Sequence, residues 1–295
     1  MPGYETTLSS TAEILASTLA LCYSESFVPG SNDWSVHLRA CRTVINTLFL
    51  RNQEGASTEH PAVAFLVKEV TDLETLSNIS IFNQECVKTV ELPLYSFHNS
   101  CTWTFTQLLN DITNTERRRH AALKNYQIIS EMDMTIWHAR ADQAYNEILT
   151  GPCFDQLDGL QHYFEAVLCT HFYANLIYSY QAFASPEALV TVVESCFDLL
   201  IENIQIVVTE ATQSFSHDLF FLLFIAGTEC RGDQQRQSFV EQLFLDIIFA
   251  TGVWCNHTAL QFLRGFWARS ETEVRTTWIQ YARANEEESG MFIAF

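Results

Sequence analysis

Apolar residues recur along most of this chain at the three- and four-residue spacing of amphipathic helices, and no stretch of useful length alternates as a β-strand does. Near the N-terminus this spacing predicts one helix over residues 10–27 and a second from residue 33 to about 48, separated by the breakers Pro29 and Gly30. Two helices joined by so short a loop are expected to pack antiparallel. A third helix is expected over residues 62–76.

The middle of the chain has a weaker pattern. Residues 78–102 lack regular apolar spacing and contain Pro93, so we expect short helices and loops there. Helical spacing returns over residues 103–149, around a charged centre, and is broken at Gly151-Pro152.

The C-terminal half predicts one helix after another, near residues 156–183, 186–208, 216–229, 233–251, 256–269 and 271–287. One segment, Leu219 to Gly227, is apolar on every face, which predicts that other helices surround it. No charge-free apolar run reaches the roughly 20 residues of a transmembrane helix. The sequence therefore predicts an all-α fold, a single bundle-like domain of antiparallel helices over residues 1–295.

Composition agrees with a bulky helical interior and restricts the partners. The chain has 22 Phe, 10 Tyr and 6 Trp but ten Gly and six Pro, so large side chains are plentiful and helix breakers are few. It has 35 Asp and Glu against 16 Lys and Arg, a net charge of −19. Such a surface repels nucleic acid and anionic membranes. The one basic cluster, Arg117-Arg118-Arg119, is expected on a solvated helix face or turn beside Glu116.

The nine cysteines indicate an intracellular protein. Their number is odd, no two have the C-x-x-C spacing, and most lie in apolar runs. This pattern favours buried, reduced thiols over a disulfide framework. The N-terminus has no basic region before its apolar stretch, so no signal peptide is expected.

Catalytic and metal-binding signatures are missing from the sequence. There is no G-x-S-x-G, P-loop, G-x-G-x-x-G or H-E-x-x-H motif. A few acidic and histidine pairs have helical or close spacing, but each supplies two ligands at most, so we interpret them as surface or hydrogen-bonded pairs: Glu131 and Asp133, Asp155 and Asp158, His162 and Glu165, His138 and Asp142. We expect neither a bound metal nor a cofactor.

Aromatic density in the last helices is the strongest feature. For most of these rings a packed core is the simple interpretation. The functional interpretation is an apolar pocket for a lipid-like or polycyclic ligand, with walls from three successive helices: Phe220, Phe224, Phe244, Phe262 and Phe266. Arg236 follows Gly232-Asp233, which suits a structural ion pair at a helix start.

Three segments carry a resemblance. Residues 216–269 contain an apolar run ending in Ile225-Ala226-Gly227, then a charged turn with Arg236, then a later helix that Trp267 closes. Earlier in the chain, residues 34–40 follow a W-x-x-H-L-x-G/A pattern and residues 173–178 form an aliphatic-aromatic segment. In order and spacing these segments resemble the C-terminal part of the fungal-specific transcription factor domain. The likeness covers most of the chain, and residues 78–155 match least.

The resemblance implies a regulatory domain like that of Zn2Cys6 binuclear-cluster activators. Such a domain senses a small hydrophobic ligand or binds a protein partner or a second copy of itself; one relative of this type encloses a sterol in an apolar pocket. The sequence has no six-cysteine zinc cluster, so we expect either an excised regulatory domain or a stand-alone descendant that has lost DNA binding.

The stand-alone case opens an alternative function. The chain would then be an enzyme of fungal secondary metabolism, a cyclase, isomerase or rearrangement catalyst that holds a hydrophobic substrate in the same pocket. Such chemistry needs one or two acids with a shifted pKa at the pocket wall. A regulator would work in the nucleus or cytoplasm, and an enzyme in the cytoplasm.

From its charge we predict that the purified chain does not bind duplex DNA in a sequence-dependent way. Its net charge of −19 makes the approach to phosphates repulsive, and no groove-reading motif compensates. Mobility-shift titration at physiological salt measures this, and submicromolar, sequence-dependent binding would contradict it.

Overall fold

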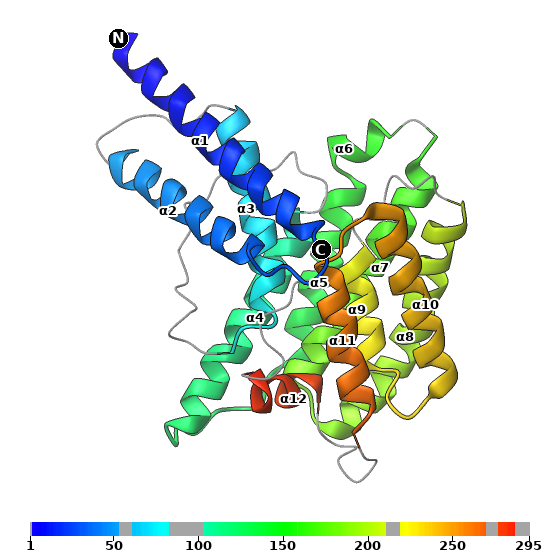
Figure 1. Ribbon diagram of the computed structural model, residues 1–295. Coiled ribbons are helices and arrows are strands. Elements are labelled where there is room, and N and C mark those ends of the chain that lie inside the picture. Colours follow the sequence, from blue (N-terminus) through cyan, green and yellow to red (C-terminus); the bar gives the residue numbers. More distant parts are fainter. Residues whose placement is uncertain are drawn as a thin grey trace.

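The computed structural model describes residues 2–52, 61–82, 103–157, 159–210, 219–269 and 277–286, and all regular structure in these residues is helical (Figure 1). This confirms the predicted all-α class. The helices are α1 (Pro2–Ser26), α2 (Trp34–Asn52), α3 (Pro61–Asn78), α4 (Trp103–Lys124), α5 (Met134–Leu149), α6 (Pro152–Asp155), α7 (Gln161–Phe183), α8 (Pro186–Glu210), α9 (Phe220–Thr228), α10 (Gln234–Thr251), α11 (Asn256–Trp267) and α12 (Trp278–Ala284). Residues 83–102, for which we expect short helices and loops, lie outside the described residues.

The N-terminal helices form the predicted antiparallel pair, and α3 packs against both (Figure 1). Leu15, Leu19 and Cys22 are buried on the inner face of α1, whereas the neighbouring Ile14 is exposed. Between α1 and α3 the hydroxyl of Tyr23 donates to Glu69 over 2.9 Å. Helical spacing therefore places Leu15, Leu19 and Cys22 on one buried face of α1, and this hydrogen bond connects α1 to α3.

The structure divides the helical stretch over residues 103–149 into α4 and α5. The chain leaves α4 through Tyr126, whose φ of 56° lies in the left-handed region that most side chains avoid. It re-enters a helix at Asp133, whose carboxylate accepts a hydrogen bond from the backbone N–H of Thr135. An N-cap of this kind satisfies a donor that a helix start leaves unpaired.

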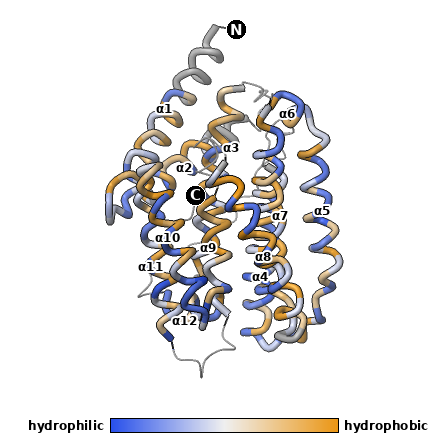
Figure 2. Tube along the Cα trace, turned by 90° about the vertical axis from the view of Figure 1, so that its right-hand side faces the viewer, coloured by the Kyte–Doolittle hydropathy of each residue, from blue (hydrophilic) through white to orange (hydrophobic). Residues whose placement is uncertain are grey.

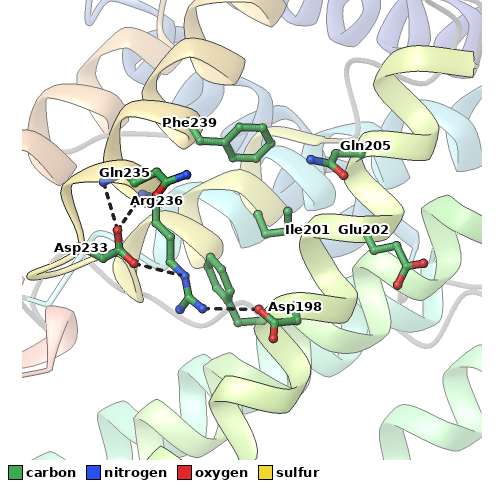
Figure 3. Close-up of a pocket in the computed structure, with 9 residues that line it drawn as sticks. Asp198, Ile201, Glu202, Gln205, Asp233, Gln235, Arg236 and Phe239 are labelled. Carbon is green, nitrogen blue, oxygen red and sulfur yellow. Dashed lines mark hydrogen bonds and ion pairs between the residues drawn. The ribbon is translucent and has the colours of Figure 1, made fainter.

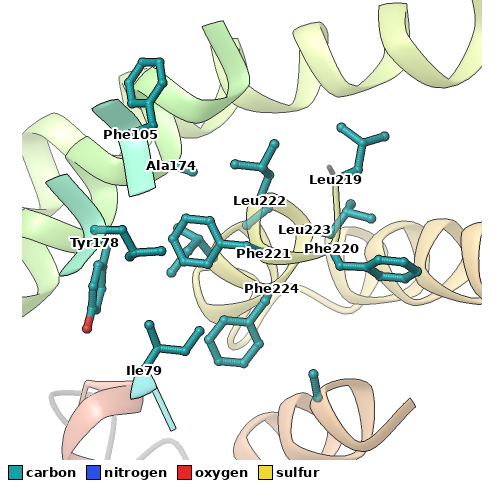
Figure 4. Packing of buried hydrophobic residues seen from close by; sticks show 14 of the residues in the cluster. Ile79, Phe105, Ala174, Tyr178, Leu219, Phe220, Phe221, Leu222, Leu223 and Phe224 are labelled. Atoms are coloured by element: carbon teal, nitrogen blue, oxygen red, sulfur yellow. The ribbon is translucent and has the colours of Figure 1, made fainter. Parts of the chain in front are cut away.

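Helix α9 occupies the centre of the C-terminal half. All nine of its residues are buried, and it packs against α7, α8, α10 and α11. Figure 2 shows it as a strongly apolar segment among helices of mixed hydropathy, and Figure 4 shows the side chains of Leu219 to Phe224 pointing in different directions. The prediction that other helices surround this segment is confirmed. No helix in the described part of the chain is long and apolar enough to cross a membrane.

Gly227 permits the close approach of α9 and α11. A Cβ atom at this position would lie 2.5 Å from a methyl carbon of the buried Leu263. The carbonyl of Gly227 also accepts a 2.8 Å hydrogen bond from the indole of Trp267. The Ile-Ala-Gly run and the later Trp, far apart in sequence, therefore form one contact between two helices.

Arg117 departs from the prediction of a solvated basic cluster. Its side chain is buried beside Glu116, with which it forms an ion pair. The guanidinium donates to the carbonyls of Ile79 and Ile81, each over 3.0 Å, and lies 3.9 Å from the centre of the Phe82 ring. The prediction is wrong for Arg117 because carbonyls just beyond the C-terminal end of α3 and a neighbouring carboxylate compensate its burial.

The second carboxylate oxygen of Glu116 accepts a 2.6 Å bond from Arg283 on α12. We call Glu116, Arg117 and Arg283 the buried ion network. It connects the end of α3, the middle of α4 and α12. Arg118, the next residue along α4, is exposed as predicted.

The six cysteines whose side chains are described are free thiols, and all but Cys169 are buried. Burial raises the pKa of Cys41 to about 11 and the pKa values of Cys22 and Cys230 to about 12. Thiols this difficult to ionise are poor nucleophiles at neutral pH, which fits a structural role.

We predict that the buried ion network contributes to the free energy of unfolding. Arg117→Met keeps a long side chain but removes the donor to the carbonyls of Asn78, Ile79 and Ile81 and to one carboxylate oxygen of Glu116. We expect the free energy of unfolding to fall by about 3–5 kcal/mol. The matched control, Arg118→Met on the exposed face of the same helix, should change it by no more than about 0.5 kcal/mol. Urea unfolding measures both, and equal losses would contradict the role given to Arg117.

Candidate functional site

The five phenylalanines predicted to line a pocket come from three helices, as expected. All five are buried. Phe220 on α9 lies 6.0 Å from Phe244 on α10, and Phe224, one turn along α9, lies 5.9 Å from Phe262 on α11. The structure therefore brings them together on one side of α9, with neighbouring rings in contact.

Helix α12 completes this set of rings. Trp278 meets Phe224 edge-on at 5.0 Å, and Tyr281 lies 5.3 Å from Phe262 and 5.4 Å from Phe266. These two rings were not predicted from the sequence, although their three-residue spacing within the helix expected at 271–287 places them on one face. We call the seven rings the aromatic layer: Phe220, Phe224, Phe244, Phe262, Phe266, Trp278 and Tyr281.

A few polar groups border the aromatic layer where α7, α9 and α12 meet. The indole of Trp278 donates to the side-chain oxygen of Gln181 over 2.7 Å. The amide nitrogen of Gln181 donates to the hydroxyl of Thr228 over 2.7 Å and to the carboxylate of Glu229. Burial raises the pKa of the Glu229 carboxyl, and the hydrogen bond from Gln181 opposes that rise. Glu229, five residues after Phe224 in the chain, is thus an acid that retains its proton to higher pH than an exposed glutamate.

A separate hollow opens between α8 and α10 (Figure 3). Its volume is about 430 Å³. Apolar side chains from both helices form its floor, and charged and amide side chains form its rim: Phe197, Asp198, Ile201, Glu202, Gln205, Asp233, Gln235, Arg236 and Phe239. We call this hollow the α8–α10 groove. This groove was not predicted from the sequence, because the side chains that line it belong to two helices that are not adjacent in the chain.

Arg236 takes part in the predicted ion pair at a helix start. The Asp233 carboxylate caps α10 by accepting from the backbone N–H groups of Gln235 and Arg236, and also lies 3.5 Å from the Arg236 guanidinium. The same guanidinium lies 3.5 Å from Asp198 and 4.4 Å from the centre of the Phe197 ring. The prediction is confirmed, and Arg236 is in addition a wall of the groove.

The acidic and histidine pairs considered as metal ligands do not come together with further ligands in the described part of the chain. Asp133 caps α5, His162 and Glu165 are exposed on α7, and Asp158 lies outside the described residues. Within the described part of the chain no three His, Cys, Asp or Glu side chains converge as metal ligands.

The chain was compared with known protein families, curated proteins and solved structures. A family model described as the fungal specific transcription factor domain matches residues 4–293. No curated protein and no solved structure matches the chain. The family match includes the stretch over residues 78–155, where the sequence resemblance is weakest. It also spans the Ile225-Ala226-Gly227 run and Trp267, which α9 and α11 bring into contact. Because the match covers nearly the whole sequence, the chain belongs to the fungal specific transcription factor domain family.

Proposed function

We propose that this chain acts as the regulatory domain of a fungal transcription factor, and that it responds to a small hydrophobic molecule held at the aromatic layer. Membership of the family supports the regulatory role. The composition of the layer supports the ligand class, because small-molecule sites combine apolar and aromatic walls with a few well-placed polar groups. Here seven rings provide the walls, and Trp278, Gln181 and Glu229 provide polar atoms at one end.

Ligand entry requires the rings to separate, because neighbouring rings of the layer are in contact. Helix α12 is the element best suited to move. It has seven residues, fewer than an isolated helix needs for stability, so its position depends on packing. Two of its side chains, Trp278 and Tyr281, cover three phenylalanines of α9 and α11. A ligand that inserts beneath them shifts α12 outward.

A shift of α12 also affects a distant part of the fold. Arg283 on the same helix donates to Glu116, which in turn pairs with Arg117 at the end of α3. A ligand changes the balance between two conformations only as far as it binds one of them more tightly. In this proposal the ligand favours the conformation in which α12 is displaced and the buried ion network is rearranged.

One observation favours the alternative function, an enzyme that acts on a hydrophobic substrate. Glu229 is a carboxyl group whose pKa burial raises, and it shares Gln181 with the Trp278 indole of the aromatic layer. A carboxyl group with a raised pKa keeps its proton to higher pH than an exposed one, and such a group can act as the general acid of a cyclisation, isomerisation or rearrangement. Under this alternative Glu229 is the catalytic acid.

The ligand proposal predicts a thermal shift. We expect at least one compound in a panel of sterols, terpenoids and polyketides to raise the melting temperature. At 100 times its Kd, such a compound adds about 2.7 kcal/mol to the free energy of unfolding. Phe262→Trp fills the layer and should abolish the shift. The matched control is Phe164→Trp, another buried ring, on α7 about 21 Å along the helix from Tyr178, which contacts the layer. It should leave the shift unchanged. Loss of the shift in both variants, or no shift with any compound, would contradict the site.

Glu229→Gln separates the regulator from the enzyme. The amide keeps the shape of the side chain but cannot donate an acidic proton. If the chain is an enzyme, conversion of the bound compound, followed by mass spectrometry, falls at least about 100-fold in this variant while the thermal shift remains. If the chain is a regulator, the compound is recovered unchanged from both proteins. The exposed Glu147→Gln on α5 serves as the control.

A further inference from the structure

We propose that the α8–α10 groove is a docking site for a basic segment of a protein partner. The segment would place an apolar side chain on the groove floor and Lys or Arg side chains against the acidic rim. This site is distinct from the aromatic layer and does not depend on the proposed ligand.

The groove lies between two helices that share α9 as a neighbour. Helices α8 and α10 both pack against α9, but they are not closely packed on each other. Helix α9 has nine residues, about 14 Å, whereas α8 has 25 and α10 has 18, about 38 Å and 27 Å. Side chains of α8 and α10 face each other across an open volume of about 430 Å³ (Figure 3).

The floor of the groove is apolar. Phe197 is buried, and Ile201 and Phe239 are half-buried with part of their surface toward the groove. Covering such surface removes apolar area from water, which favours a complex. Aromatic and branched side chains also lose little conformational freedom when a partner covers them. An aliphatic or aromatic side chain is the matching group on a partner.

The rim carries three carboxylates, Asp198, Glu202 and Asp233, and one guanidinium, Arg236. The Arg236 charge is already matched by Asp198 and Asp233. Glu202 is exposed and has no hydrogen bond or ion pair within the described part of the chain. The side chain of Asp198 is 74% exposed, so its carboxylate can accept a further donor. The charge left over is negative, which complements a cationic partner and repels phosphate.

The shape favours a peptide segment. On α8 the lining residues run from Phe197 to Gln205, about 12 Å or two helical turns. This length accommodates one apolar anchor with basic residues three or four positions away on the same helical face. The exposed amides of Gln205 and Gln235 add hydrogen-bonding groups at the rim.

The test uses a fluorescent 14-residue amphipathic Leu/Lys peptide, whose binding is measured by fluorescence anisotropy at physiological salt. Glu202→Lys reverses one unpaired charge on the exposed rim and should weaken binding at least tenfold. The matched control, Glu131→Lys, reverses an exposed charge in the α4–α5 connection, far from α8 and α10 (Figure 1), and should change affinity less than twofold. Equal weakening by both variants would show general electrostatic attraction and overturn the proposal.

Two further arms test the chemistry of the partner. Replacing every Leu of the peptide by Ala should weaken binding at least tenfold, since the anchor is lost; unchanged affinity would contradict the role of the apolar floor. Phenylbutylamine tests whether the groove instead takes a small organic cation. Displacement of the peptide by this amine at comparable concentration would overturn the peptide proposal. None of these results depends on the thermal shift that tests the aromatic layer.

Discussion

The fold is organised around a helix that has no polar face. Every residue of α9 is apolar or buried, so the chain must cover it from all sides, and α7, α8, α10 and α11 do so. Gly227 sets how closely α11 can approach, because a Cβ atom there would overlap Leu263. The aromatic layer follows from this arrangement, because rings fill the contact of α9 with its neighbours. The α8–α10 groove lies between two of the helices that cover α9.

Buried polar contacts determine how the short terminal helix is attached. Helix α12 is connected to α7 through Trp278 and Gln181, and to α4 through Arg283 and Glu116. Polar groups removed from water destabilise a fold unless their partners are placed correctly, so these bonds restrict α12 to one position. An apolar helix face alone would allow several. Displacing α12, as proposed for ligand binding, would disturb both sets of bonds together.

The two candidate sites differ in chemistry and in exposure. The aromatic layer is internal and apolar, with a protonatable carboxyl group nearby, whereas the groove is open and negatively charged at its rim. They meet at the turn between α9 and α10, where Glu229 borders the Gln181 hydrogen bonds and Asp233 pairs with Arg236 in the groove wall. The same short turn therefore connects the site proposed for a small molecule with the site proposed for a protein partner.

The sequence by itself determined the helical class, the bounds of most C-terminal helices, the central position of α9 and the ion pair of Arg236. Each of these depends on spacing within a few residues, which is visible in a single sequence. The tertiary structure decided the burial of Arg117, the inclusion of Trp278 and Tyr281 in the aromatic layer, and the existence of the groove. From the sequence Arg117 is expected at the surface. In the structure it is buried, because carbonyls 36 and 38 positions earlier in the chain compensate its charge. Local spacing shows which face of a helix is buried, but which distant residue covers it depends on three-dimensional packing.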